Sequence, residues 1–290
     1  MAEITASLVK ELREMTGVGM MECKKALVDA EADLEKAVDL LRTRGLAAVA
    51  KKAGRETNEG LISAQVSEDG KTAVLVEVNC ETDFVSRNDV FGDYVKKITA
   101  AAVGEDYADV EAFKAATIDG QTVGDILTEA IQTIGENIQV SRVIRRTVEN
   151  GAISSYIHGG GRLGVLVQFK FDKAETANSA EFKTLAKDVA MQVAAANPGA
   201  VTREGFSAEI IEHEMEIYKA KAAASGKPEN IQEKIAEGNL KKFYEENSLV
   251  EQAFVKDPDK NIGQVVDAVS KAVGDTIEII AFDRFGLGQN

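Results

Sequence analysis

Few side chains in this sequence are suited to covalent chemistry. The chain has two histidines and two cysteines, which are His158, His213, Cys23 and Cys80. A nucleophilic catalytic set would need one of these histidines beside a serine or a cysteine. However, His158 falls in a predicted hairpin turn and His213 in the middle of a predicted surface helix. We therefore rank catalysis behind two other readings of His158, a solvated turn residue and a contact with a partner.

Metal, disulfide and nucleotide sites are not indicated by spacing either. Cys23 and Cys80 are far apart, without a C-x-x-C motif, and we interpret both as small buried thiols. The phosphate-binding pattern G-x-x-x-x-G-K-[ST] is absent. The glycines at 159–161 follow His158 in a turn and do not open a helix. We predict no cofactor, no metal and no nucleotide bound by the chain itself.

The segment Thr82-Asp83-Phe84-Val85 has the composition of a contact site. It lies between a predicted buried strand at 72–78 and a helix with apolar spacing that begins near Phe91. A structural reading would fold Phe84 under the helix and use Thr82 or Asp83 as its cap. The other reading is a probe that enters a partner, since aromatic side chains are enriched at the centres of interfaces.

The first 45 residues predict three short helices. Thr5 and Asp33 are expected to cap the first and third of them, Gly19 opens the second, and Gly45 is expected to end the third. Two adjacent methionines, Met20 and Met21, stand where a loop enters the second helix. They favour an adaptable contact surface, with core packing of at least one of them as an equal alternative.

The rest of the chain repeats itself. Residues 60–78 align with 151–169 at an offset of 91, and the segments around 122–138 and 261–277 align at an offset of 139. Each copy predicts a β-hairpin, one or more helices and a third strand, hence an antiparallel sheet covered by helices. Asp83 and Phe84 are replaced by Ala174 and Glu175 in the second copy, so the scaffold does not require the aromatic. Asp275 holds the place of Glu136, which indicates a local structural role for that carboxylate.

The two offsets differ by 48 residues, which locates an insertion in the second copy. Residues 207–224 and 229–246 are both amphipathic and are separated by Ser225-Gly226-Lys227-Pro228. Two helices joined by so short a turn should pack antiparallel as a projecting hairpin. The candidates for its seam are Ile210, Ile211, Met215, Ile217, Ile231, Ile235, Leu240 and Phe243.

The predicted fold class is therefore α+β, in four parts. They are a three-helix module (1–45), a helical linker (46–59), core subdomain N (60–148) and core subdomain C (149–290), which carries the hairpin at about 207–247. The chain has 290 residues and a net charge of −14, so its surface as a whole repels nucleic acid and anionic membranes. No apolar run is long enough for a membrane span, and the N-terminal residues do not show a basic region followed by an apolar stretch, so we expect no signal peptide. We expect a cytoplasmic protein that would reach RNA or the ribosome only through a protein partner.

Three stretches of the sequence resemble the bacterial translation elongation factor Ts family, and the resemblance extends over essentially the whole chain. The stretches are TGVGMMECKKAL (16–27), EVNCETDFV (77–85) and YIHGGGRLGVLV (156–167). The resemblance implies a guanine nucleotide exchange factor for the GTPase elongation factor Tu, with a ubiquitin-associated-like N-terminal module and a protruding coiled coil. It leaves open whether the complex with elongation factor Tu is a heterodimer or a dimer of two such heterodimers.

The resemblance further implies roles for particular residues. Thr82 to Val85 would enter the GTPase near its Mg²⁺ and displace the ion, with Phe84 as the wedge and Asp83 as its polar companion. The other partner contacts implied are Met20, Met21, Lys24, Ile134, Gly135 and His158. Longer members of the family continue past the last strand into a further helix, so contacts made by that helix are not carried over. Two rival classes stay open from the residues alone, an enzyme using Asp83, Glu136 or His158 and an adaptor without effect on nucleotide.

Overall fold

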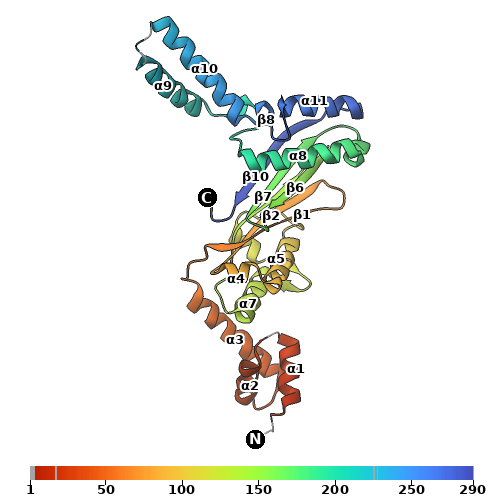
Figure 1. Cartoon of the computed structure of the whole chain (residues 1–290). Coiled ribbons are helices and arrows are strands. Elements are labelled where there is room, and N and C mark those ends of the chain that lie inside the picture. Colours follow the sequence, from red (N-terminus) through yellow and green to blue (C-terminus); the bar gives the residue numbers. More distant parts are fainter. Residues whose placement is uncertain (1–3, 17, 225, 227, 290) are drawn as a thin grey trace.

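The computed structural model describes residues 4–16, 18–224, 226 and 228–289. The molecule is elongated, with three N-terminal helices at one end, a helical hairpin at the other and two small sheets with their helices between (Figure 1). It mixes helices with antiparallel sheets, as the α+β prediction requires. Gly17, Ser225, Lys227 and Asn290, which belong to predicted turns and to the end of the chain, lie outside the described residues.

The N-terminal helices are α1 (Ala6–Thr16), α2 (Met20–Asp29) and α3 (Leu34–Lys52). Asp33 accepts a hydrogen bond from the Lys36 backbone N–H at 3.1 Å and so caps α3, as predicted. Their small core centres on Leu12, Cys23 and Leu27, all fully buried. Cys23 and Cys80 are both buried and free, which confirms the interpretation of the two thiols.

Gly45 does not end the third helix, and this prediction is wrong. Helix α3 continues through it to Lys52, so the predicted linker begins as an extension of the same helix. A Cβ atom at position 45 would collide with the side chain of Gln132, in helix α7 (Val123–Ile134). The glycine therefore serves the close approach of two helices and not a cap. The boundaries of independently folding parts stay a prediction.

The first core copy consists of a sheet in the order β1-β2-β5 with helices on one face. Its elements are β1 (Glu59–Val66), β2 (Thr72–Cys80), α4 (Asp83–Ser86), α5 (Asp89–Ala101), α6 (Val110–Lys114), β3 (Thr117–Ile118), β4 (Gln121–Thr122), α7 and β5 (Gln139–Thr147). Val74, Val76 and Val78 of β2 pack against Phe91 and other apolar residues of the helices. Alternate residues of one strand face the helices because strand side chains alternate between the two faces.

The second copy repeats this plan in the order β10-β7-β6. Its elements are β6 (Ala152–His158), β7 (Leu163–Lys170), η1 (Ala174–Asn178), α8 (Ala180–Ala196), η2 (Arg203–Gly205), α9 (Ala208–Ala223), α10 (Glu229–Asn247), η3 (Leu249–Glu251), β8 (Ala253–Phe254), β9 (Asp257–Asn261), α11 (Ile262–Val273) and β10 (Glu278–Gly286). The predicted repeat of hairpin, helices and third strand is thus confirmed in both copies.

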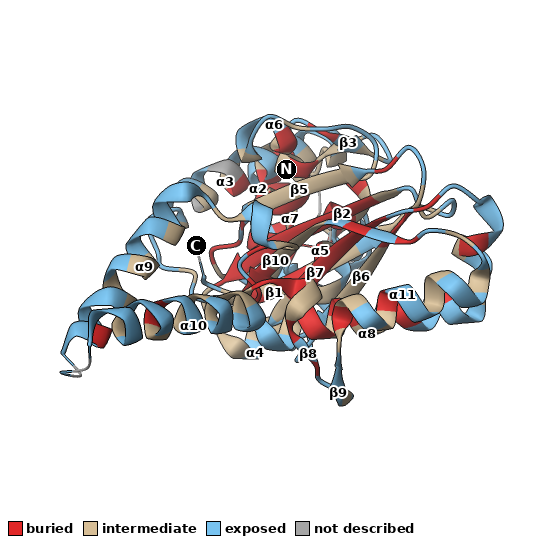
Figure 2. Ribbon diagram, turned by 90° about the horizontal axis from the view of Figure 1, so that it is seen from above, coloured by how far each residue is buried: buried red, intermediate tan, exposed pale blue. Residues whose placement is uncertain are grey.

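The two sheets pack against each other through the faces that their helices leave free. Ile62 and Leu75 from the first sheet meet Ile153, Leu166 and Phe285 from the second in one buried cluster. Strands β2 and β7 are consequently buried on both faces, whereas the helical hairpin is mostly exposed (Figure 2). This packing makes the two copies one body that can present residues from both.

Ionic contacts join the third strands of the two copies. Arg146 on β5 forms a bidentate pair with Asp283 on β10, at 2.9 and 2.7 Å. Arg142 donates to the buried Glu77 at 2.7 Å and also to the Gly286 carbonyl at 2.7 Å. Bidentate arginine pairs fix orientation as well as distance, so the register between the copies is set.

Helices α9 and α10 form the projecting antiparallel hairpin that the inserted residues predicted (Figure 1). Its seam is narrower than expected. Ala222 and Ala236 are the buried residues of its two helices. Ile210 and Ile231 are 47% and 40% exposed, so assigning these two to the seam was wrong. The other candidates are half-buried, namely Ile211, Met215, Ile217, Ile235, Leu240 and Phe243. Small alanines let the two helices approach closely, which leaves larger side chains at the edge of the contact.

Candidate partner-binding site

Phe84 is the most exposed large apolar side chain in the described part of the chain. It lies on α4, a single turn that follows strand β2, and 84% of it is accessible to solvent. The alternative in which Phe84 folds under a helix is therefore wrong. Exposing an aromatic ring of this size forgoes the free energy of burying it, so the position favours a contact with another molecule.

The other residues of the Thr82–Val85 segment hold the turn. The Thr82 hydroxyl accepts a hydrogen bond from the Val85 backbone N–H at 3.4 Å and caps α4. Val85 packs against the core of the first copy, whereas Asp83 pairs with Arg87 at 3.0 Å on the surface. The segment thus has an inward anchor, Val85, and an outward pair, Asp83 and Phe84.

A carboxylate from the neighbouring loop binds the start of this turn. Glu136 accepts hydrogen bonds from the backbone N–H groups of Glu81 and Thr82, both at 3.0 Å, and from the Thr82 hydroxyl at 2.6 Å. In return, Glu81 accepts from the backbone N–H of Asn137 at 2.6 Å and from Arg55 at 3.3 Å. Each loop therefore supplies a carboxylate that binds backbone N–H groups of the other loop. Glu136 has the local structural role that its counterpart Asp275 indicated.

These contacts alter the acidity of their groups. The Asn137 N–H, followed by Arg55, holds the pKa of Glu81 below its ordinary value of 4.5. In the same region burial raises the pKa of the Cys80 thiol to about 12. A thiol with so high a pKa is not a nucleophile at neutral pH, which removes Cys80 as a candidate for covalent chemistry.

Acid should weaken the fold through Glu81. Because its pKa is lower in the folded state than its ordinary value, its contribution to stability is complete above about pH 4.5 and is lost as the pH falls through the folded pKa. We expect the melting temperature, measured by circular dichroism, to fall below that pH. Glu81→Gln should be less stable at pH 7 and lose less on acidification. An identical acid dependence in wild type and Glu81→Gln would contradict this assignment.

Ile134 and Gly135 lie next to the Thr82 turn, because Glu136 follows them directly. Ile134 ends α7 and is partly buried against the core of the first copy. Gly135 is exposed and caps α7 in the left-handed conformation, with φ of 91°. The structure therefore brings two of the predicted contact segments, 82–85 and 134–135, to one place.

His158 reaches the same end of the first sheet from the second copy. It is exposed at the tip of the β6–β7 hairpin, and its Nδ1 lies 2.9 Å from the Tyr156 hydroxyl. The tip is held on β1, where Ile62 N–H donates to the Gly161 carbonyl at 2.7 Å and Arg162 pairs with Glu59 at 3.1 Å. Glu59 is opposite Cys80 in the sheet, just before the turn that carries Phe84.

Met20, Met21 and Lys24 lie apart from this group, on α2 of the N-terminal module. All three are exposed, and Met20 and Met21 are 42% and 66% accessible. The alternative that one methionine packs in the core is therefore wrong. Two adjacent exposed methionines form an apolar surface that is soft enough to adapt to a partner.

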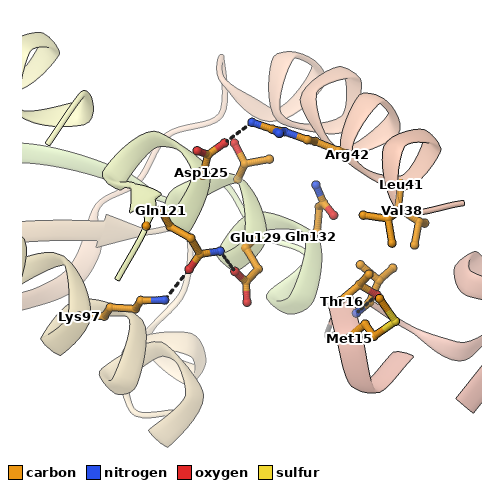
Figure 3. A pocket seen from close by; sticks show the side chains of 13 residues that line it. Met15, Thr16, Val38, Leu41, Arg42, Lys97, Gln121, Asp125, Glu129 and Gln132 are labelled. Carbon is orange, nitrogen blue, oxygen red and sulfur yellow. Dashed lines mark hydrogen bonds and ion pairs between the residues drawn. The ribbon is translucent and has the colours of Figure 1, made fainter. Parts of the chain in front are cut away.

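A cleft that the sequence did not predict separates this module from the first core copy. Its volume is about 480 Å³, and its lining includes Met15, Val38, Gln121 and Glu129. Figure 3 shows Arg42 of α3 reaching across it to Asp125 of α7, at 3.1 Å. The pair ties the module to the core, and no sequence signal could reveal it because the two residues are 83 positions apart.

The network also contains a residue that sequence reasoning missed. Glu81 is as closely involved in the turn as Glu136, yet it was not singled out. One signal was available, because Asp172 stands at the matching position of the second copy, 91 residues later, and its backbone N–H also meets the counterpart carboxylate, Asp275, at 3.4 Å.

Metal-binding groups and membrane-spanning helices are both absent from the described ranges. No group of three or more histidine, cysteine, aspartate or glutamate side chains there is arranged to hold a metal ion. No helix among these residues is long and apolar enough to cross a membrane.

Comparison with known proteins places this arrangement in a family. A model of the family described as elongation factor TS matches residues 81–289. Elongation factor Ts of Trichlorobacter lovleyi is 47% identical over 289 residues, which cover 99% of this chain and 93% of that protein. The chain belongs to the elongation factor Ts family.

Further members of the family agree over nearly the same length. Elongation factor Ts of Desulfovibrio desulfuricans is 46% identical over 99% of both chains, and that of Clostridium perfringens is 47% identical over 287 residues. These alignments include the N-terminal helices, which the family model does not reach. The chain is thus a translation elongation factor by family, and the resemblance seen in its motifs is confirmed.

Proposed function

We propose that the chain is a guanine nucleotide exchange factor that binds elongation factor Tu with GDP, displaces its Mg²⁺ and promotes GDP release during translation elongation. The exposed Phe84, on a turn held by Glu136 and by the packing of Val85, is the observation that carries this proposal. Asp83 is its polar companion. The remaining contacts in the proposal are Thr82, Val85, Ile134, Gly135 and His158 in the core and Met20, Met21 and Lys24 in the N-terminal module.

The physics of nucleotide binding makes a wedge sufficient. A GTPase holds its nucleotide largely through the phosphates and Mg²⁺, so disturbing the metal and the phosphate loop weakens binding without competition for the base. Thermodynamic linkage makes this coupling reciprocal. If the exchange protein binds the empty GTPase more tightly than the nucleotide-bound GTPase, it must weaken nucleotide binding by the same ratio of affinities. The proposed activity therefore needs no covalent step and no cofactor in this chain.

The setting of the proposed activity follows from charge and family. A net charge of −14 disfavours direct contact with nucleic acid or anionic membranes, so the proposed partner is the GTPase alone. We place the activity in the cytoplasm. A complex of one factor with one GTPase and a dimer of such heterodimers are both compatible with this proposal.

Release of a fluorescent GDP analogue from elongation factor Tu, followed by stopped flow, tests the proposal. Mixing with excess unlabelled GDP and the wild-type chain should accelerate release by orders of magnitude over unlabelled GDP alone. Binding without acceleration, seen by titration calorimetry beside an unchanged release rate, would make the chain an adaptor and refute the exchange function.

A further inference from the structure

The turn that carries Phe84 has few contacts of its own, namely the Thr82 cap and the packing of Val85 against the core. Helix α4 has four residues and none of them is buried. A single helical turn is unstable in water, because fixing its backbone costs more than its few hydrogen bonds return. The direction of the Phe84 side chain must therefore be set from outside the turn.

Glu136 supplies this constraint at the first residues of the turn. One of its oxygens accepts from the Glu81 and Thr82 backbone N–H groups at 3.0 Å, and the other accepts from the Thr82 hydroxyl at 2.6 Å. Because the hydroxyl proton points to Glu136, an oxygen lone pair is left for the Val85 N–H at 3.4 Å. The carboxylate thus fixes the cap of the helix on which Phe84 lies.

The second copy contains a similar arrangement, in which the hydroxyl comes from the position that matches Val85 and not Thr82. Asp275 accepts from the Lys173 N–H at 2.9 Å and from the Thr176 hydroxyl at 2.7 Å. Both carboxylates follow a left-handed glycine that ends a helix, Gly135 or Gly274. In the second copy the segment held in this way carries Glu175 in place of Phe84. The carboxylate is therefore a feature of the scaffold, and only the first copy uses it to present an aromatic ring.

We propose that Glu136 is a positioning residue for nucleotide exchange, holding the Thr82 turn so that Phe84 stands in the orientation that enters the partner. This rests on the exchange function proposed above. An aromatic side chain held in its bound orientation loses less conformational freedom on insertion than one on a mobile loop. Loss of Glu136 should therefore slow nucleotide exchange because Phe84 is less well positioned. Glu136 itself would contact neither the nucleotide nor the metal.

Matched substitutions in the two copies separate positioning from a general effect on folding. Glu136→Ala is expected to lower the GDP release rate at saturating factor about tenfold, the order of effect of losing preorganisation. Asp275→Ala removes the same type of carboxylate from the second copy and should leave that rate unchanged. In a Phe84→Ala background, Glu136→Ala should have little further effect. Equal losses from Glu136→Ala and Asp275→Ala would overturn the proposal.

The conservative variant keeps the test valid if Glu136→Ala folds poorly. In Glu136→Gln the amide oxygen can still accept from the two backbone N–H groups, but its NH₂ group cannot accept from the Thr82 hydroxyl. We expect a release rate between those of wild type and Glu136→Ala. A Glu136→Gln rate no higher than that of Glu136→Ala, with both chains folded by circular dichroism, would contradict positioning by these hydrogen bonds.

A measurement on the free chain distinguishes failure of this proposal from failure of the exchange function. The chain contains no tryptophan, so Phe84→Trp places a single tryptophan, which can be excited selectively over the tyrosines, on the turn. Adding Glu136→Ala should increase the fast decay of its fluorescence anisotropy, and adding Asp275→Ala should not. An unchanged decay with Glu136→Ala would overturn the positioning role, whether or not the wild-type chain accelerates GDP release.

Discussion

Phe84→Ala should abolish most of the acceleration of GDP release while the chain remains folded. The ring is 84% exposed in the free chain, so its removal leaves no cavity and should cost little stability. In the proposed complex, truncating a central aromatic contact should change affinity or rate by about 10- to 100-fold. Stopped-flow release of fluorescent GDP from elongation factor Tu, over a range of factor concentrations, measures both the plateau rate and the half-saturating concentration.

The second copy again offers the matched control for Phe84→Ala. Glu175 stands at the equivalent position, 91 residues later, and Glu175→Ala should leave the plateau rate unchanged. If Phe84 is the wedge, Phe84→Ala should lower the plateau release rate by a larger ratio than it weakens binding, because the ring would act after the GTPase has bound. A Phe84→Ala chain with the wild-type plateau rate would show that Phe84 is not the wedge.

Substituting both methionines of the N-terminal module should have the other large effect, and on a different quantity. Met20→Ser and Met21→Ser together remove an exposed apolar surface that is distant from the Phe84 turn along the molecule (Figure 1). If the module grips the GTPase, binding should weaken by about 10- to 100-fold, the usual range for losing two apolar anchors. The release rate at saturating factor should remain close to that of wild type, because the wedge is intact.

Titration calorimetry with nucleotide-free elongation factor Tu measures the affinity, and stopped flow measures the saturating rate. Val255→Ser is a suitable control, since Val255 is also about half exposed but lies between β8 and β9, far along the chain from α2. A double methionine variant that binds as tightly as wild type would remove the N-terminal module from the interface.

The repeat explains why so much of the fold could be predicted. Matching hairpins at 60–78 and 151–169 fixed the pairing of four strands, and the helix-to-strand matches near 134 and 273 supplied the third strand of each sheet. The difference between the two offsets located the hairpin of α9 and α10. The same comparison favoured a functional role for Phe84, because a residue needed by the scaffold should occur in both copies.

Interactions between distant segments were beyond the sequence. A glycine such as Gly45 is typical of a helix end. Here it instead makes room for the side chain of Gln132 of α7, which only the packing of the two helices reveals. The seam of the hairpin was misjudged at two positions for a similar reason, since Ile210 and Ile231 are exposed where the two helices bury Ala222 and Ala236. The reciprocal hydrogen bonds of the Glu81 and Glu136 carboxylates join two loops that are 55 residues apart in the sequence.

Displacement of Mg²⁺ by the Phe84 turn is tested most directly by measuring GDP release in excess Mg²⁺ and again in excess EDTA, each with and without saturating factor. If the turn acts by dislodging the ion, part of its effect is already present when the metal has been removed. The acceleration caused by the wild-type chain should therefore be at least about tenfold larger in Mg²⁺ than in EDTA, and Phe84→Ala should lose most of that difference. Equal acceleration by the wild-type chain under both conditions would contradict displacement of the metal.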